Sequence, residues 1–221
     1  LEGALSDLAA TASLAAATPR AVADRLFGLL QGDAFGATDG AVPILAPALG
    51  EAGLARLRER LDQALTLPGG RDPGEYRHWQ LRASLKAVML AQGDLDSWIG
   101  SMSPEQRSLP QQAAEIGRRL LEAGRAADAL AVLEAADGPR PEEDDRSDLA
   151  LSPRDRLLLR LERELDGQEA DDREEVLIEA LAATGQKERA QARRWEGFER
   201  TLSVRRLRAF LGQLPDFEDF L

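Results

Sequence analysis

Apolar residues recur every three or four positions along much of the chain, which is the spacing of one buried face on an α-helix. Residues 115–136 show this pattern on both sides of Gly124, and residues 176–192 show it on both sides of Gly185. Two such stretches joined at a glycine predict a pair of antiparallel helices.

Helix starts are marked where a hydroxyl residue precedes proline. The hydroxyl accepts a backbone N–H at the N-cap, and proline fits the first turn because its missing N–H costs nothing there. Gln106 also follows Ser103 at the spacing of a capping box. The three predicted starts are Thr18-Pro19, Ser103-Pro104 and Ser152-Pro153.

Glycines mark the predicted helix ends, each after an apolar stretch, as a left-handed C-terminal cap prefers. They are Gly32, Gly93, Gly124 and Gly185. Their separations approximate one or two units of roughly 30 residues, close to the period of helical-hairpin repeats. The chain is therefore predicted to be all-α, an α-solenoid of antiparallel helix hairpins with a tetratricopeptide-like arrangement.

The expected helices cover most of the chain, and Leu and Ala far outnumber Val and Ile, which favours helices over strands. Their predicted ranges are 4–16, 19–31, 41–49, 52–66, 75–92, 94–101, 110–123, 126–136, 153–165, 172–184, 186–201 and 204–213. We divide the chain into an N-terminal helical-repeat part (1–136), an acidic loop with two prolines (137–150) and C-terminal hairpins (151–221). The two helical parts are expected to form one continuous solenoid.

Composition excludes several classes of function. The 221 residues include no Cys and one His, so disulfides, thiolate nucleophiles and Cys- or His-rich metal sites are excluded. A formal net charge of −11 opposes general nucleic-acid binding. No apolar run approaches the roughly 18 residues of a membrane span. We expect a cytoplasmic, bacterial protein with no membrane contact, no catalytic residue, no metal and no cofactor, and not an enzyme.

Three groups of side chains are candidates for a catalytic, cofactor or metal site, and for each a structural role is expected instead. His78 has no visible nucleophile or acid beside it, so we expect a surface or packed side chain. Trp79 and Trp98 are expected to be helix–helix core contacts. Two carboxylate sets lack the spacing of a calcium loop and are expected to be solvated charge. These sets are Glu142, Glu143, Asp144 and Asp145, and Asp171, Asp172, Glu174 and Glu175.

The basic stripe is the one candidate binding site, and it consists of Arg189, Arg193 and Arg200. On a helix these three project to one side, with Trp195, Phe198 and Leu202 on the other. The functional interpretation is a face that docks an acidic partner or a nucleic-acid backbone. The structural interpretation is a solvated helix face, neutralised by the acidic loop or by acidic residues at 216–219, with the apolar side in the core.

Two stretches resemble a large bacterial family of unknown function. They are FGATDGAVPILAPALGEAGLARLRERL at 35–61 and RWEGFERTLSVRRLRAFLGQLPDFEDF at 194–220, which contains an RW-x-x-FERTL block followed by LPDF-x-D. Residues 91–99 and 113–137 are similar to the same family. The resemblance implies a tetratricopeptide-like helical fold in a chain that is an internal portion or a short member, and it implies no activity or cofactor.

The expected function is a non-catalytic scaffold for protein–protein interaction, in which stacked hairpins hold a protein or peptide partner. The alternative is a nucleic-acid-associated accessory module that uses a basic patch at residues 186–208. Salt separates the two hypotheses, because nucleic-acid affinity falls steeply with ionic strength whereas an apolar groove responds little.

Overall fold

The computed structural model describes residues 18–33, 38, 40–66, 74–136, 168 and 171–214, with backbone only at 74–77. These residues form ten helices and no β-strand, so the all-α prediction is confirmed for them. The chain divides into two compact units, Leu1–Ser101 and Met102–Leu221. The acidic loop at 137–150 and the expected helices at 4–16 and 153–165 lie outside the described residues.

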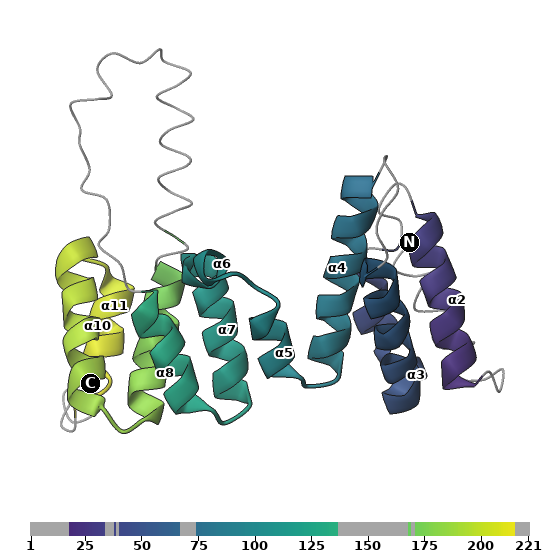
Figure 1. The fold of residues 1–221 in the computed structure, drawn as a ribbon. Coiled ribbons are helices and arrows are strands. Elements are labelled where there is room, and N and C mark those ends of the chain that lie inside the picture. The colour runs from purple at the N-terminus through teal and green to yellow at the C-terminus, as the bar shows by residue number, and fades with distance from the viewer. Residues whose placement is uncertain are drawn as a thin grey trace, which may run out of the picture. The chain divides into compact units, whose positions relative to one another are not determined.

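The described residues of the first unit form four helices: α2 (Pro19–Gly32), α3 (Ala41–Thr66), α4 (Gly74–Ala91) and α5 (Leu95–Gly100). Helices α2, α3 and α4 lie side by side (Figure 1) and bury a leucine-rich core between them. Its fully buried leucines are Leu26, Leu30, Leu45, Leu49, Leu57 and Leu61. The expected break between two helices at residues 49–52 appears as a kink in α3, where Gly50 adopts φ +52°.

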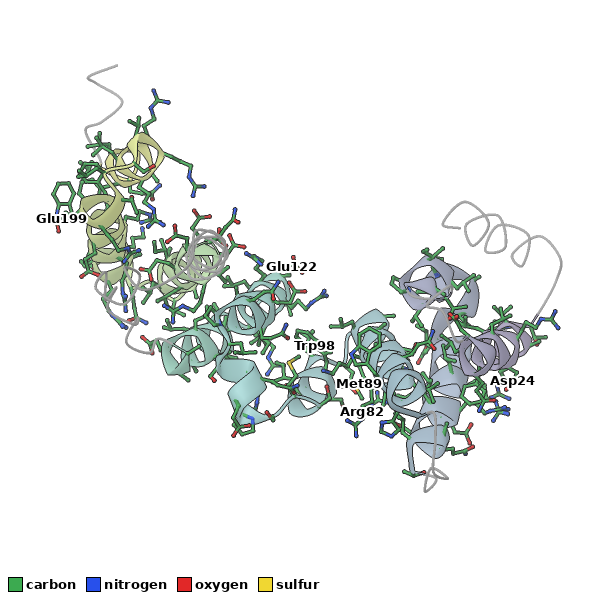
Figure 2. The ribbon with its side chains drawn as sticks, turned by 90° about the horizontal axis from the view of Figure 1, so that it is seen from above. Asp24, Arg82, Met89, Trp98, Glu122 and Glu199 are labelled. Atoms are coloured by element: carbon green, nitrogen blue, oxygen red, sulfur yellow. The ribbon has the colours of Figure 1, made fainter. Side chains whose placement is uncertain are left out.

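Helices α2 and α3 approach closely at Gly53. A Cβ added there would lie 2.8 Å from the carbonyl oxygen of Pro19, so only glycine fits. On the outer side, Asp24 accepts from Arg56 at 3.1 Å and from Arg60 at 3.0 Å. Arg60 also lies over the Phe27 ring, 4.6 Å from its centroid. Asp24 is labelled in Figure 2. The α2–α3 contact therefore has an apolar interior and a charged rim.

The second unit begins with a short helix and continues in antiparallel helices. They are α6 (Pro104–Ser108), α7 (Pro110–Glu122), α8 (Ala126–Ala135), a helix over residues 171–183, α10 (Lys187–Thr201) and α11 (Val204–Leu211). Gly117 marks where three of these helices meet. A Cβ there would lie 2.9 Å from both Leu133 of α8 and Val176 of the helix over 171–183. A small residue on α7 thus lets both neighbours pack against it.

Three glycines end helices in the same way. Gly93, Gly124 and Gly185 have φ of +70°, +74° and +79°. In each case the next residue donates its N–H to a carbonyl five positions back, at 2.9, 2.7 and 2.8 Å, which is the Schellman turn. These three predicted caps are confirmed, and each turn leads directly into the next helix.

The fourth glycine prediction is confirmed for the helix end, because α2 stops at Gly32, and wrong for the left-handed cap. Gly32 is the last residue of α2 and has no positive φ, and Asp33 caps the helix in an extended conformation. The chain leaves α2 extended because the Asp33 carboxylate holds the following loop, accepting from the N–H and the hydroxyl of Thr38 at 2.6 and 2.7 Å. A side-chain anchor replaces the left-handed cap.

Two of the three predicted helix starts lie within the described residues, and both are confirmed. Thr18 accepts from the N–H of Ala21 at 3.3 Å. Ser103 and Gln106 form a reciprocal capping box, although the α6 helix that it opens was not among the expected ranges. Ser152-Pro153 lies outside the described residues. Among the residues that the structure describes, no helix has the length and apolar character to cross a bilayer.

Candidate interaction surface

The three arginines of the basic stripe lie on α10, and each has an acidic partner in the second unit. Arg189 pairs with Glu134 of α8 at 2.7 Å. Arg193 lies 3.7 Å from Glu174, and Arg200 lies 3.8 Å from Asp171. Arg189 also donates to Gln186. The stripe therefore joins α10 to two other helices, and its role in binding a partner stays a prediction.

The acidic set on the helix over residues 171–183 forms the other half of this arrangement. Asp171 also pairs with Arg206 at 2.8 Å, and Asp172 lies 3.3 Å from Arg118. Glu175 accepts from Arg205. The side chains of Asp171, Asp172 and Glu175 stay 37%, 59% and 45% exposed, in line with the interpretation as solvated charge, whereas that of Glu174 is only 6% exposed. Arginines from α7, α10 and α11 pair with these carboxylates. The first carboxylate set, at 142–145, and the acidic residues at 216–219 lie outside the described residues.

Arg206 reaches its partner because Gly197 leaves room on α10. A Cβ at Gly197 would overlap Nη1 of Arg206, whose side chain is only 12% exposed. A glycine inside a helix often marks such a close approach. Gly197 thus allows α11 to send an arginine across α10 to Asp171, a function that the periodicity of α10 did not reveal.

The apolar side of α10 differs from the prediction. Trp195 is 40% exposed and Leu202 is 73% exposed, so these two residues do not form a buried face. Trp195 instead packs within its own hairpin, with ring centroids 5.4 Å from Phe198 and 5.1 Å from Phe210 of α11. The buried positions of α10 are small ones, Ala190 and Gly197. Charged contacts and small residues occupy the side that the aromatic residues were expected to fill.

The turn between α10 and α11 exposes two large apolar side chains that lie two residues apart in the sequence. Leu202 ends α10 in the left-handed conformation at φ +48°, and it is the one non-glycine residue with positive φ in the described part of the chain. Leucine pays a steric penalty in this conformation. Val204, two residues later, is 63% exposed. We call Leu202, Val204 and Trp195 the hairpin surface. Glu199, labelled in Figure 2, marks the position of α10.

A groove lies between the helix over residues 171–183, α10 and α11, with a volume of about 280 Å³. Its apolar walls are Ile178 and Ala209. Arg194 donates to Gln191 at 3.1 Å and has no ion pair with any described residue. Burial lowers the pKa of the Arg194 guanidinium below its usual value. Arg194 belongs to the RW-x-x-FERTL block, but the partial burial of its side chain depends on helices that are distant along the chain.

The first unit contains a smaller cavity of about 230 Å³ beside α4, with a mainly apolar lining that includes Gln80 and Thr38. Gln80, 1% exposed, donates to Asp33 at 3.0 Å and to Thr38 at 3.1 Å, so this cluster fixes the loop after α2 to α4. Trp79 at its edge is 58% exposed, and the expectation that Trp79 is core is wrong. Trp98 is buried, as predicted, at 5%. His78 is exposed on α4.

No group of His, Asp and Glu suitable for a metal ion occurs among the residues that the structure describes. What they define is an all-α protein with helices packed as neighbouring pairs. The whole chain, residues 1–221, matches the model of a family of unknown function, DUF6880, and the chain belongs to that family. The comparisons find no match among curated proteins and none among solved structures.

Proposed function

We propose that the chain is a non-catalytic, tetratricopeptide-like scaffold that binds an apolar segment of a partner protein on the hairpin surface. The proposed solenoid character is supported by the three identical glycine turns, since each reverses the chain between adjacent helices. Helical-hairpin arrays commonly present extended surfaces to partners.

The exposed apolar side chains at the α10–α11 turn carry the proposal. A contiguous exposed apolar patch marks an interaction site in many proteins, and we take Leu202 and Val204, which lie two residues apart at the turn, to be part of such a patch. Leu202 strengthens the argument, because leucine is strained in the left-handed conformation and its side chain nevertheless stays exposed. Burial within the hairpin therefore does not compensate for the strain. An apolar segment of a partner would cover Leu202, Val204 and the edge of Trp195.

The nucleic-acid alternative has less support. Arg189, Arg193 and Arg200 are each within ion-pair distance of a carboxylate, so a phosphate would have to displace that carboxylate. The experiment below distinguishes a protein partner from a nucleic-acid partner.

The test uses the full chain and the variant Leu202→Gly, which keeps the left-handed turn and removes only the side chain. A Leu202→Asp/Val204→Asp variant adds charge to the same surface. Leu109→Asp is the matched control, since Leu109 is also 54% exposed in the second unit but precedes α7. Partners are captured from cells that make the protein and are then mapped by hydrogen exchange.

A partner that protects α10 and α11 amides, survives Leu109→Asp and is lost from both surface variants supports the proposal. Capture that is unchanged in both surface variants refutes it. Loss of the partner on nuclease treatment, with a steep decline between low and moderate salt, identifies the nucleic-acid module instead.

A further inference from the structure

The groove beside the hairpin has an unusual imbalance in how its arginines are neutralised. Arg205 pairs with Glu175, and Arg206 pairs with Asp171 at 2.8 Å. Arg194 contributes to the same groove but has only its bond to Gln191 among the described residues. One guanidinium therefore faces the groove with most of its five N–H donors unused by the helices around it.

An arginine in this position carries a cost that a ligand can remove. Partial burial takes water from the guanidinium, as the lowered pKa of Arg194 reflects. A desolvated charge is normally compensated by an opposite charge or by several hydrogen bonds. The planar guanidinium matches a carboxylate in a two-point contact, which is among the stronger hydrogen-bonded pairs in proteins.

The remaining walls of the groove limit what can bring that negative charge. Ile178 and Ala209 offer apolar contact, so the ligand has an apolar portion beside its charge. Glu175 and Glu179 also line the groove, and the chain carries a net charge of −11. These carboxylates repel any anion, but a run of phosphates would meet far more repulsion than a single negative charge next to an apolar side chain.

We propose that Arg194 receives the side-chain carboxylate of an acidic residue in a partner peptide, with the neighbouring apolar residue of that peptide packed on Ile178 and Ala209. The site rests on the proposed function, because it would be the charged half of the surface whose apolar half is the α10–α11 turn. It gives that surface a chemical preference: an acidic residue adjacent to an apolar one.

The test uses the full chain and a pair of end-blocked peptides, Ala-Leu-Glu-Leu-Ala and the same peptide with Gln in place of Glu. Binding is followed by titration, recording the NMR signal of the Arg194 side-chain Nε–H. We expect the Glu peptide to shift this signal and to bind about tenfold more tightly than the Gln peptide, as for a hydrogen bond between charged groups. Arg194→Gln should remove that preference.

Arg208→Gln is the matched control, because Arg208 is an exposed arginine of α11 that does not line the groove. It should change the affinity for the Glu peptide by less than about twofold. Equal binding of both peptides, an unchanged preference in Arg194→Gln, or no shift of the Arg194 signal overturns the proposal. Displacement of the Glu peptide by inorganic phosphate at far lower concentration than by acetate reassigns the site to phosphate and also overturns it.

The two proposals fail separately. The peptide preference is read at Arg194 with chemically defined probes, whereas the protein-binding function is read through Leu202 and Val204. If the captured partner is lost from Leu202→Gly but unaffected by Arg194→Gln, the interaction function stands and the carboxylate site falls. A Glu-peptide preference with no partner lost from Leu202→Gly gives the opposite result.

Discussion

Arg206 of α11 crosses α10 directly over Gly197, and this crossing is what allows it to pair with Asp171 at 2.8 Å. The side chain of Arg206 is mostly buried along its path. Two residues in different helices of one hairpin thus depend on each other: the arginine needs the glycine for space, and the glycine has no other evident use inside a helix.

This dependence predicts that Gly197→Ala lowers stability only when Arg206 is present. The methyl group displaces Arg206 from Asp171, which costs about 2 kcal/mol for an ion pair between the exposed and the buried extremes, against a helix-propensity gain of about 1 kcal/mol. We expect a net loss of about 1 kcal/mol. In an Arg206→Ala background the same change should raise stability, and a double-mutant cycle measures the coupling. Equal effects in both backgrounds would contradict the crossing.

A second glycine should respond to substitution through packing alone. Gly117→Ala brings a methyl group 2.9 Å from Leu133 and Val176, so overpacking of about 1–3 kcal/mol exceeds the helix-propensity gain. Gly28→Ala in α2 is the matched control, because a Cβ there meets nothing within 4 Å. Thermal or denaturant unfolding should show destabilisation at residue 117 and stabilisation by about 0.5–1 kcal/mol at residue 28. A stabilising Gly117→Ala would be the contrary result.

Leu202→Gly should make the protein more stable. The left-handed conformation at φ +48° disfavours leucine by about 1 kcal/mol relative to glycine, and the 73% exposed side chain loses little by removal. We expect a gain of up to about 1 kcal/mol in the free energy of unfolding. The control is Val204→Ala, which changes an exposed residue without a positive φ and should have little effect. Destabilisation by Leu202→Gly would mean that the side chain contributes to folding.

Stability of the first unit should depend on the ionisation of Asp94. The hydroxyl of Ser97, then Arg58, then the backbone N–H of Ser97 lower the pKa of this carboxyl from 3.8 to about 2. Because the folded-state pKa is below the unfolded one, the stabilisation is present above about pH 4 and is lost as the pH falls toward 2.

Asp94→Asn should remove that part of the pH dependence and lower stability at neutral pH, since the N-cap acceptor loses its charge while the contact with Arg58 at 2.7 Å weakens. Denaturant unfolding between about pH 2 and pH 6 measures the difference. Parallel pH profiles for the two proteins would be inconsistent with the lowered pKa of Asp94.

The attachment of the α10–α11 hairpin to the helix over residues 171–183 should be sensitive to salt. Arg193, Arg200, Arg205 and Arg206 pair with acidic residues of that helix. Raising the salt concentration to about 1 M shortens the range of such interactions to about 3 Å. Amide hydrogen exchange should then accelerate in α10 and α11 more than in α2 and α3, whose contact is largely apolar. Uniform acceleration would indicate that the ion pairs contribute little.

The sequence predicted the helix ends well because the contacts that form these ends join residues that are close together in the sequence. The capping box at Ser103 and Gln106 and the glycine turns at Gly93, Gly124 and Gly185 involve residues within six positions of one another. Gly32 ends α2 as predicted, but its left-handed cap was predicted wrongly, because a side-chain contact between Asp33 and Thr38 determines how the chain leaves α2.

The candidate surface was less predictable because its causes are distant in sequence. Periodicity assigned the aromatic side of α10 to the core, but Glu134 and Asp171, tens of residues away from Arg189 and Arg200, decide which side faces inward. Nothing in the local pattern shows that Arg194 lines a groove together with Ile178 and Ala209. Only the glycine at 197, conspicuous inside a helical pattern, hinted at a close approach.

The ion pairs found among the described residues all use arginine, and the sequence contains only two lysines, Lys86 in α4 and Lys187 at the start of α10. Amine-directed reagents will therefore modify one side chain in each unit, besides the terminal α-amine, without disturbing any of those pairs. A fluorophore or photo-cross-linker can be placed next to the hairpin at Lys187 on otherwise unaltered protein, with Lys86→Arg blocking the other position.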